Sequence, residues 1–160
     1  MEYKPDEQIM KEAIKMAYLA RGEGDYAIGA LTVRDGEIFT LGENKVKIDN
    51  DPTAHAEIVA IRKATQITSS RHLEGVVLYS THEPCPMCTS AAIWAKMDGI
   101  ISGTYIEDMA DYRKSHPSSQ WLWRTIDVHP KYLIDNTEEN LFLIRGFMRD
   151  ECLKLFHSTQ

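Results

Sequence analysis

The stretch VVLYSTHEPCPMCTSAA, residues 76–92, joins a β-rich apolar run to two cysteines that lie one helical turn apart. Such a continuous apolar run is typical of a strand that is covered on both faces. Cys85 and Cys88 follow it, with Pro86 between them. Proline suits the first position of a helix, where its missing N–H costs nothing. The stretch therefore predicts a strand that leads directly into a helix over residues 86–97.

The rest of the chain alternates helical and strand patterns. Asp35-Gly36 lies between two short apolar runs and suits the tight turn of a hairpin. Strand, helix and strand around the cysteines imply a right-handed crossover and parallel pairing. We therefore expect an α/β fold with a single domain over residues 1–160, namely a three-layer α/β/α sandwich around a mixed five-stranded sheet. The predicted helices cover residues 5–21, 52–66, 86–97 and 147–157, the predicted strands cover the two arms of the hairpin within 28–44 and residues 76–81, 99–105 and 140–146, and residues 106–129 are expected to form an irregular loop.

Composition places the chain among ordinary globular proteins. It has 160 residues, of which 26% are charged and 43% are apolar. No apolar run approaches the roughly 20 residues of a membrane-spanning helix. The polar start, MEYKPDEQ, lacks the apolar segment of a secretory signal, so we expect a cytoplasmic protein whose thiols stay reduced. The formal net charge of −6 weighs against binding of nucleic acid through its phosphates.

The two cysteines have the spacing of metal ligands. A helix N-terminus lowers the pKa of nearby thiols and makes them good thiolate ligands for zinc. The third ligand is expected from TAHAE, residues 53–57, which begins another predicted helix. His55 and Glu57 lie two residues apart and cannot share a helical face, yet at a first turn both can reach a point beyond the helix end. We assign His55 to the metal and Glu57 to the space beside it, which leaves one position open, as in a catalytic zinc site.

Simpler interpretations of the same residues exist. The cysteine pair could be a redox pair, or part of a closed structural zinc site with His82 or Cys152 as the fourth ligand. Cys152 falls on an apolar helical face and is more simply a small buried residue. Trp121 and Trp123 could stack on a flat base or could anchor the loop that contains them.

HAE followed by PCPMC is the H-x-E…P-C-x-x-C pattern of zinc-dependent nucleobase deaminases. With NDPTAHAEIVAIRKA, residues 50–64, and EPCPMC, residues 83–88, the chain resembles the cytidine and deoxycytidylate deaminase superfamily. Within it, the chain looks most like the purine-type branch of bacterial guanine deaminases and tRNA adenosine deaminases. The resemblance covers most of residues 5–105. One departure is Ala27-Ile28-Gly29-Ala30, where family members usually carry a proline, and another is the loop DYRKSHPSSQWLWR.

The resemblance implies a fold, a reaction and a site. It implies Zn²⁺ held by His55, Cys85 and Cys88, with Glu57 as the proton shuttle of a hydrolytic deamination. Asn44 and the backbone N–H of Ala56 would hold the base, no organic cofactor is needed, and at least a homodimer is expected. We favour a free purine such as guanine as the substrate, because the chain is acidic and its last residues, HSTQ, lack a basic extension. The alternatives are a tRNA wobble adenosine, then a cytosine-type base, and finally a non-catalytic binding module folded around structural zinc.

Overall fold

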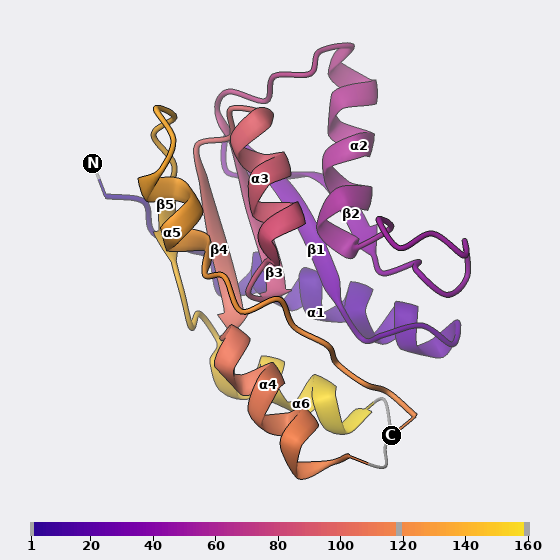
Figure 1. Ribbon diagram of the computed structural model, residues 1–160. Helices are drawn as coiled ribbons and strands as arrows, with labels where there is room; N and C mark the ends of the chain where they lie inside the picture. Colours follow the sequence, from indigo (N-terminus) through magenta and orange to yellow (C-terminus); the bar gives the residue numbers. More distant parts are fainter. Residues whose placement is uncertain (1, 118–119, 159–160) are drawn as a thin grey trace.

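The computed structural model describes residues 2–117 and 120–158, and its centre is a mixed sheet of five strands (Figure 1). The strand order is β2-β1-β3-β4-β5. β1 pairs antiparallel with β2 and β3, whereas β3–β4 and β4–β5 are parallel. The expected mixed α/β sheet is therefore confirmed. The strands are β1 (Gly29–Arg34), β2 (Glu37–Glu43), β3 (Val76–His82), β4 (Gly99–Thr104) and β5 (Phe142–Ile144).

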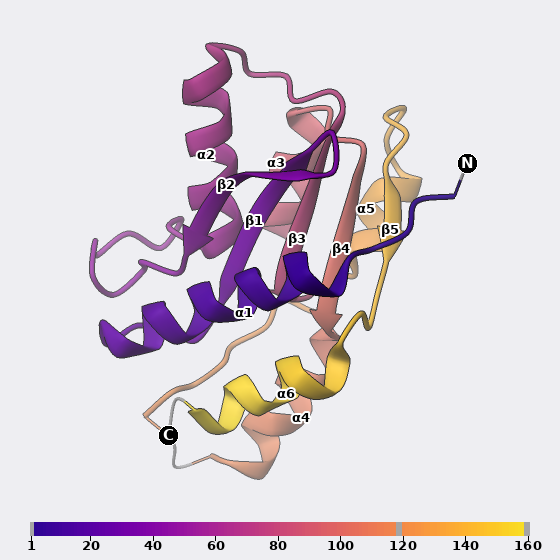
Figure 2. The same ribbon diagram turned by 180° about the vertical axis from the view of Figure 1, so that it is seen from behind.

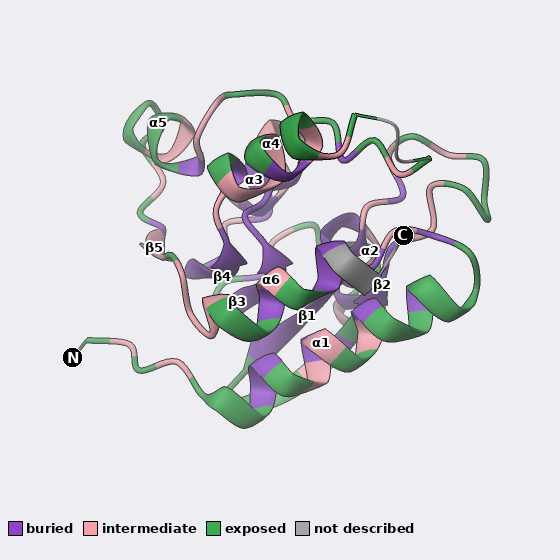
Figure 3. Cartoon of the chain, turned by 90° about the horizontal axis from the view of Figure 1, so that it is seen from below, coloured by how far each residue is buried: buried purple, intermediate pink, exposed green. Residues whose placement is uncertain are grey.

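Helices cover both faces of the sheet, as Figures 1 and 2 show from opposite sides. α1 (Glu7–Gly22) and α6 (Arg149–Ser158) lie on one face, and α2 (Ala56–Thr68) and α3 (Pro86–Trp94) lie on the other. α5 (Pro130–Asp135) packs beside α3, and α4 (Ile106–Ser115) contacts α6 beyond the end of β4. Helices show buried inner faces and exposed outer faces (Figure 3). None of the helices in the described ranges is long and apolar enough to cross a bilayer.

β3 is buried along its whole length and sends alternate side chains into the two layers. Leu78 packs in the cluster formed by α2 and α3, whereas Val77 and Tyr79 pack in the cluster formed by α1. Period-2 alternation then directs Ser80 and His82 toward the α2–α3 layer. This layer contains the N-termini of both helices that carry the predicted metal ligands.

The hairpin and most helices lie where the sequence predicted them, but the start of α2 does not. The prediction placed Pro52 and Thr53 at the beginning of this helix, whereas α2 begins at Ala56. The Asp51 carboxylate accepts hydrogen bonds from the Thr53 backbone N–H and hydroxyl, both at 2.8 Å, and this turn delays the helix. As a result His55 is the residue that precedes the helix, with an extended backbone.

The prediction of an irregular loop over residues 106–129 was wrong for its first part, which forms α4. Asp108 accepts a hydrogen bond at 2.8 Å from the backbone N–H of Tyr105, the residue before the helix. An acidic side chain in the first turn that binds this N–H is a standard way to start a helix. Among the described residues, the irregular part is therefore restricted to residues 116–117 and 120–129. Residues 118 and 119 of the predicted loop lie outside the described residues.

Candidate metal centre and active site

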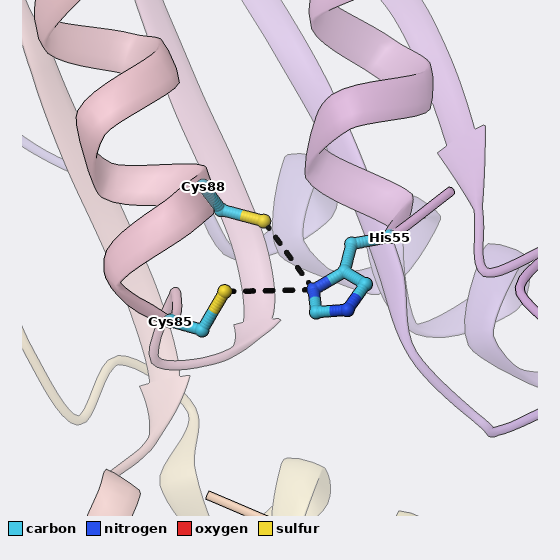
Figure 4. Close-up of side chains that lie close together, drawn as sticks. All are labelled: His55, Cys85 and Cys88. Atoms are coloured by element: carbon cyan, nitrogen blue, oxygen red, sulfur yellow. Dashed lines mark hydrogen bonds between the residues drawn. The ribbon is translucent and has the colours of Figure 1, made fainter. Parts of the chain in front are cut away.

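The N-termini of α2 and α3 bring together the three predicted metal ligands (Figure 4). His55 precedes α2, Cys85 precedes α3, and Cys88 lies in the first turn of α3. Nδ1 of His55 is 3.5 Å from Sγ of Cys85 and 3.5 Å from Sγ of Cys88. The three side chains come from segments 30 residues apart in the sequence, so the fold creates this cluster.

The spacing of these atoms fits a tetrahedral zinc ion. Zinc binds sulfur at about 2.3 Å and nitrogen at about 2.0–2.1 Å, which places N and S ligands of a tetrahedral site about 3.6 Å apart. The two observed nitrogen–sulfur distances agree with this value, and all three ligand atoms lie within 4.8 Å of one another. One imidazole and two sulfurs therefore fit zinc, and they supply three of its four usual ligands.

The two thiols differ in acidity. The hydrogen bond with Cys88 lowers the pKa of Cys85 to about 4 against the opposing effect of burial, and His55 adds to the lowering. Burial raises the pKa of Cys88 well above the usual range. The pair therefore favours one thiolate beside one thiol. A dication between the sulfurs supplies the charge that makes a second thiolate favourable.

Glu57 lies beside the three ligands on the first turn of α2. Its side chain is buried, with 4% of the residue surface exposed. Ser80 donates a hydrogen bond at 2.9 Å to Oε1, and the Cys88 thiol lies 3.7 Å from Oε2. Burial raises the pKa of the Glu57 carboxyl. A carboxyl with a raised pKa, held in one orientation, is suited to accept a proton and to return it.

The two candidate fourth ligands are engaged elsewhere. Nε2 of His82 lies 3.2 Å from the carbonyl oxygen of Ala27, which can only accept, so Nε2 carries the proton. Nδ1 then accepts from the Thr104 hydroxyl at 2.6 Å. Burial lowers the pKa of His82 to about 4, which keeps the ring neutral. Cys152 is buried in the layer on the α1 side of the sheet.

A cavity of about 220 Å³ opens beside the ligands. His55, Glu57 and Cys85 line it, and so does Asn44, which is 2% exposed. Ala56 is not among the described residues that line the cavity, although its two neighbours in the chain are. The structure thus brings Asn44 to the same space as the predicted metal ligands.

The segment after α4 forms one wall of this cavity. Trp123 is 2% exposed and packs edge-on against Tyr26 and His82, with ring centroids 5.2 and 5.3 Å apart. Trp121 also packs edge-on against Tyr26, at 4.9 Å. Both tryptophans therefore anchor the segment, and Trp123 in addition lines the cavity together with residues 124–126.

A second cluster of ionisable groups lies near the cavity and consists of Glu83, Glu107 and His129. Nη2 of Arg145 donates to Oε1 of Glu83 at 3.0 Å and to Oε2 of Glu107 at 3.3 Å. The guanidinium already supplies a cation to both carboxylates. The cluster is therefore an ion-pair network that connects the end of β3 with α4 and α5.

Sequence reasoning missed Ser80, the wall that follows Trp123, and Asp25, whose carboxylate accepts a hydrogen bond from Nδ2 of Asn44 at 2.9 Å. The position of Ser80 could have been inferred from β3, since alternate residues of a strand share a face. Asp25 and the wall meet the site only through contacts between distant segments, which no local pattern reports.

Comparison with known proteins agrees with this geometry. The family model described as "Cytidine and deoxycytidylate deaminase zinc-binding region" matches residues 3–104. The chain belongs to this deaminase family. Guanine deaminase of Bacillus subtilis is 35% identical over 122 residues, which cover 76% of each chain. A tRNA-specific adenosine deaminase of Buchnera aphidicola is 33% identical over 155 residues, which cover 97% of this chain and 93% of the relative.

Solved structures show the same fold. A structure from a study of A-to-I editing by tRNA deaminases at the wobble position of transfer RNA superposes with a TM-score of 0.75 at 25% identity. It covers 94% of this chain and 99% of the other. The expected cytidine deaminase-like fold is confirmed. These relatives are hydrolases that act on C–N bonds, and two substrate classes, guanine and tRNA adenosine, occur among them.

Proposed function

We propose that the protein is a zinc-dependent hydrolase that removes the amino group of a free purine base such as guanine and releases ammonia. The observation that carries this proposal is the position of Glu57, a buried carboxyl with a raised pKa beside the His55, Cys85 and Cys88 cluster. A zinc site with a purely structural role does not require a buried carboxyl with a raised pKa at the edge of a cavity.

The chain's own residues would move the protons. When bound by His55, Cys85 and Cys88, zinc supplies Lewis-acid activation of a water molecule, with a water pKa near neutrality. Glu57 accepts the proton of the attacking water and delivers it to the ring nitrogen next to the carbon that bears the amine. It then takes the remaining proton of the added hydroxyl, as the carbonyl forms and the C–N bond breaks, and passes this proton to the departing ammonia. Ser80 keeps one carboxyl oxygen in place through its hydrogen bond.

Other groups of the cavity would orient the base. Asn44, which lines the cavity, would hold its polar edge, together with the backbone N–H of Ala56, which lies between the two lining residues His55 and Glu57. The carbon to be attacked would then lie close to the activated water. Apolar side chains of Ile28, Val46 and Trp123 line the same cavity and suit the flat faces of a heterocycle. Both sets of contacts restrict the ring to one orientation.

Charge favours a free base over a polynucleotide. Among the described residues that line the cavity, Arg124 is the single lysine or arginine, and the chain carries a net charge of −6. Binding through phosphates needs several cationic contacts. Deamination of a tRNA wobble adenosine is the second candidate, and the nearly full-length match to a tRNA-specific adenosine deaminase favours it. A cytosine-type base ranks third, and a non-catalytic zinc module last.

Ammonia release from guanine, adenine, cytosine and a tRNA anticodon stem, assayed side by side, tests the substrate. We expect turnover of a free purine and none of the tRNA stem. Glu57→Gln should lower the rate by about 10²- to 10⁴-fold while zinc stays bound. Glu37→Gln, at an exposed carboxylate of β2, is the matched control. Loss of zinc or of folding in the Glu57 variant, with the control intact, would favour the non-catalytic module instead.

A further inference from the structure

Asp25 is a fully buried carboxylate that the proposed proton transfers leave unused. It follows α1 and accepts four hydrogen bonds. Oδ1 accepts from the backbone N–H of Tyr26 at 2.8 Å and from Nδ2 of Asn44 at 2.9 Å. Oδ2 accepts from the backbone N–H groups of Lys47 and Ile48 at 2.8 and 3.2 Å. One carboxylate thereby connects the loop after α1 with the loop after β2.

These hydrogen bonds fix which way the Asn44 amide points. A carboxylate accepts hydrogen bonds and cannot donate them, so the Asn44 atom that faces Asp25 must be the N–H donor. Oδ1 is then the other end of the amide. It is buried and accepts no hydrogen bond from residues 2–117 or 120–158. Leaving such an acceptor unsatisfied costs about 1–3 kcal/mol, which a substrate N–H can recover.

We infer that Asp25 is a positioning residue that makes Asn44 present its oxygen to the substrate, so that the site selects bases with an N–H donor. This inference rests on the proposed deaminase function. Asn44 lines the cavity together with His55 and Glu57, so its amide borders the space where the base would be held.

The chemistry of purines turns this orientation into selectivity. A lactam purine such as guanine keeps ring N–H donors besides the amine that leaves. An adenine nucleoside donates through the leaving amine alone, because its free ring nitrogens are acceptors. A site that offers a fixed, buried acceptor rejects a base that cannot donate to it. The acceptor therefore favours the lactam purine.

Asp25→Asn tests the positioning role. With its oxygen toward the backbone N–H groups of Lys47 and Ile48, the new amide leaves one backbone N–H unpaired, that of Tyr26, whereas the opposite orientation leaves two. The favoured orientation turns its NH₂ toward Asn44 and reverses the Asn44 amide. We expect kcat/KM for guanine to fall about 10- to 100-fold, mainly through KM, with zinc content unchanged. Asp49→Asn, at an exposed carboxylate in the same loop, is the matched control and should behave as wild type.

A double-mutant cycle separates positioning from a general structural role. In an Asn44→Ala background the Asp25→Asn substitution should change kcat/KM less than about two-fold, because Asp25 acts through Asn44. An equal loss in both backgrounds would overturn the inference. So would an Asp25→Asn enzyme that uses guanine as well as wild type does.

Two measurements are made on the folded wild-type protein. Guanines methylated singly at each ring nitrogen should include one whose binding falls about 10-fold or more, and equal binding of all would contradict the selectivity. In ¹⁵N spectra the Asn44 side-chain amide, assigned with Asn44→Ala, should exchange slowly with water. Fast exchange would refute the Asp25–Asn44 pairing whatever the substrate is. Wild type that releases no ammonia from any purine would instead refute the proposed function.

Discussion

Replacement of Gly42 by alanine is the sharpest test of how the fold positions the site. Gly42 lies in β2 directly beneath α2. A Cβ at this position would lie 2.2 Å from the carbonyl oxygen of Ala56 and 2.8 Å from the backbone nitrogen of Ala60. Both atoms belong to the helix backbone, which cannot rotate away as a side chain would. Either α2 must move away from the sheet or β2 must bend.

The size of the shift follows from these distances. Ordinary contact begins near 3.4 Å, so the strand and the first turn of α2 must separate by roughly 1 Å. Overpacking of this kind costs about 1–3 kcal/mol of stability. Ala56 lies between His55 and Glu57, so the displacement moves the predicted metal ligand and the proposed proton shuttle together. A misplacement of about 1 Å at reacting groups can cost about 10²-fold in rate.

Three measurements on Gly42→Ala test whether the contact between β2 and α2 positions the site: ammonia release, zinc content and thermal unfolding. We expect kcat/KM to fall about 10²-fold and the melting temperature to drop by several degrees. Gly22→Ala is the control, because a Cβ at Gly22, the last residue of α1, meets nothing within 4 Å. A Gly42→Ala protein with wild-type activity and full zinc content would show that the β2–α2 contact does not position the site.

Three further predictions concern other parts of the site. Burial lowers the pKa of His82 to about 4, so on acidification the unfolded state binds a proton first, and wild type should lose about 2 kcal/mol of stability between about pH 6.5 and pH 5. His82→Gln should lack this loss in urea denaturation with chelator present in both proteins. Trp123→Ala should cost about 3 kcal/mol in urea denaturation and raise KM for the base, whereas Trp123→Phe should retain most of both. Removal of zinc with a chelator should abolish ammonia release and lower the melting temperature, and added zinc should restore both.

Local sequence patterns predicted the metal cluster because each ligand lies at a helix N-terminus that its own neighbours define. Pro86 indicates the start of α3, and the cysteines follow from that start. The central strand was equally clear, since an uninterrupted apolar run has few other uses in a chain of this size. The start of α2 was misplaced because the Asp51 side chain accepts from the backbone N–H and the hydroxyl of Thr53 and keeps this residue in a turn, a local effect that apolar periodicity does not report.

The parts that sequence patterns could not predict are those that pair distant segments. Asp25 accepts a hydrogen bond from Asn44, 19 residues away in the sequence. Trp123 packs against Tyr26 and His82, which belong to much earlier segments of the chain. The predicted metal ligands and Glu57 are encoded locally at two helix ends, whereas the orientation of the Asn44 amide and the cavity wall depend on tertiary contacts. Proteins with the same zinc motif can therefore differ in the base they accept, because the contacts that shape the cavity change independently of the residues that hold the metal.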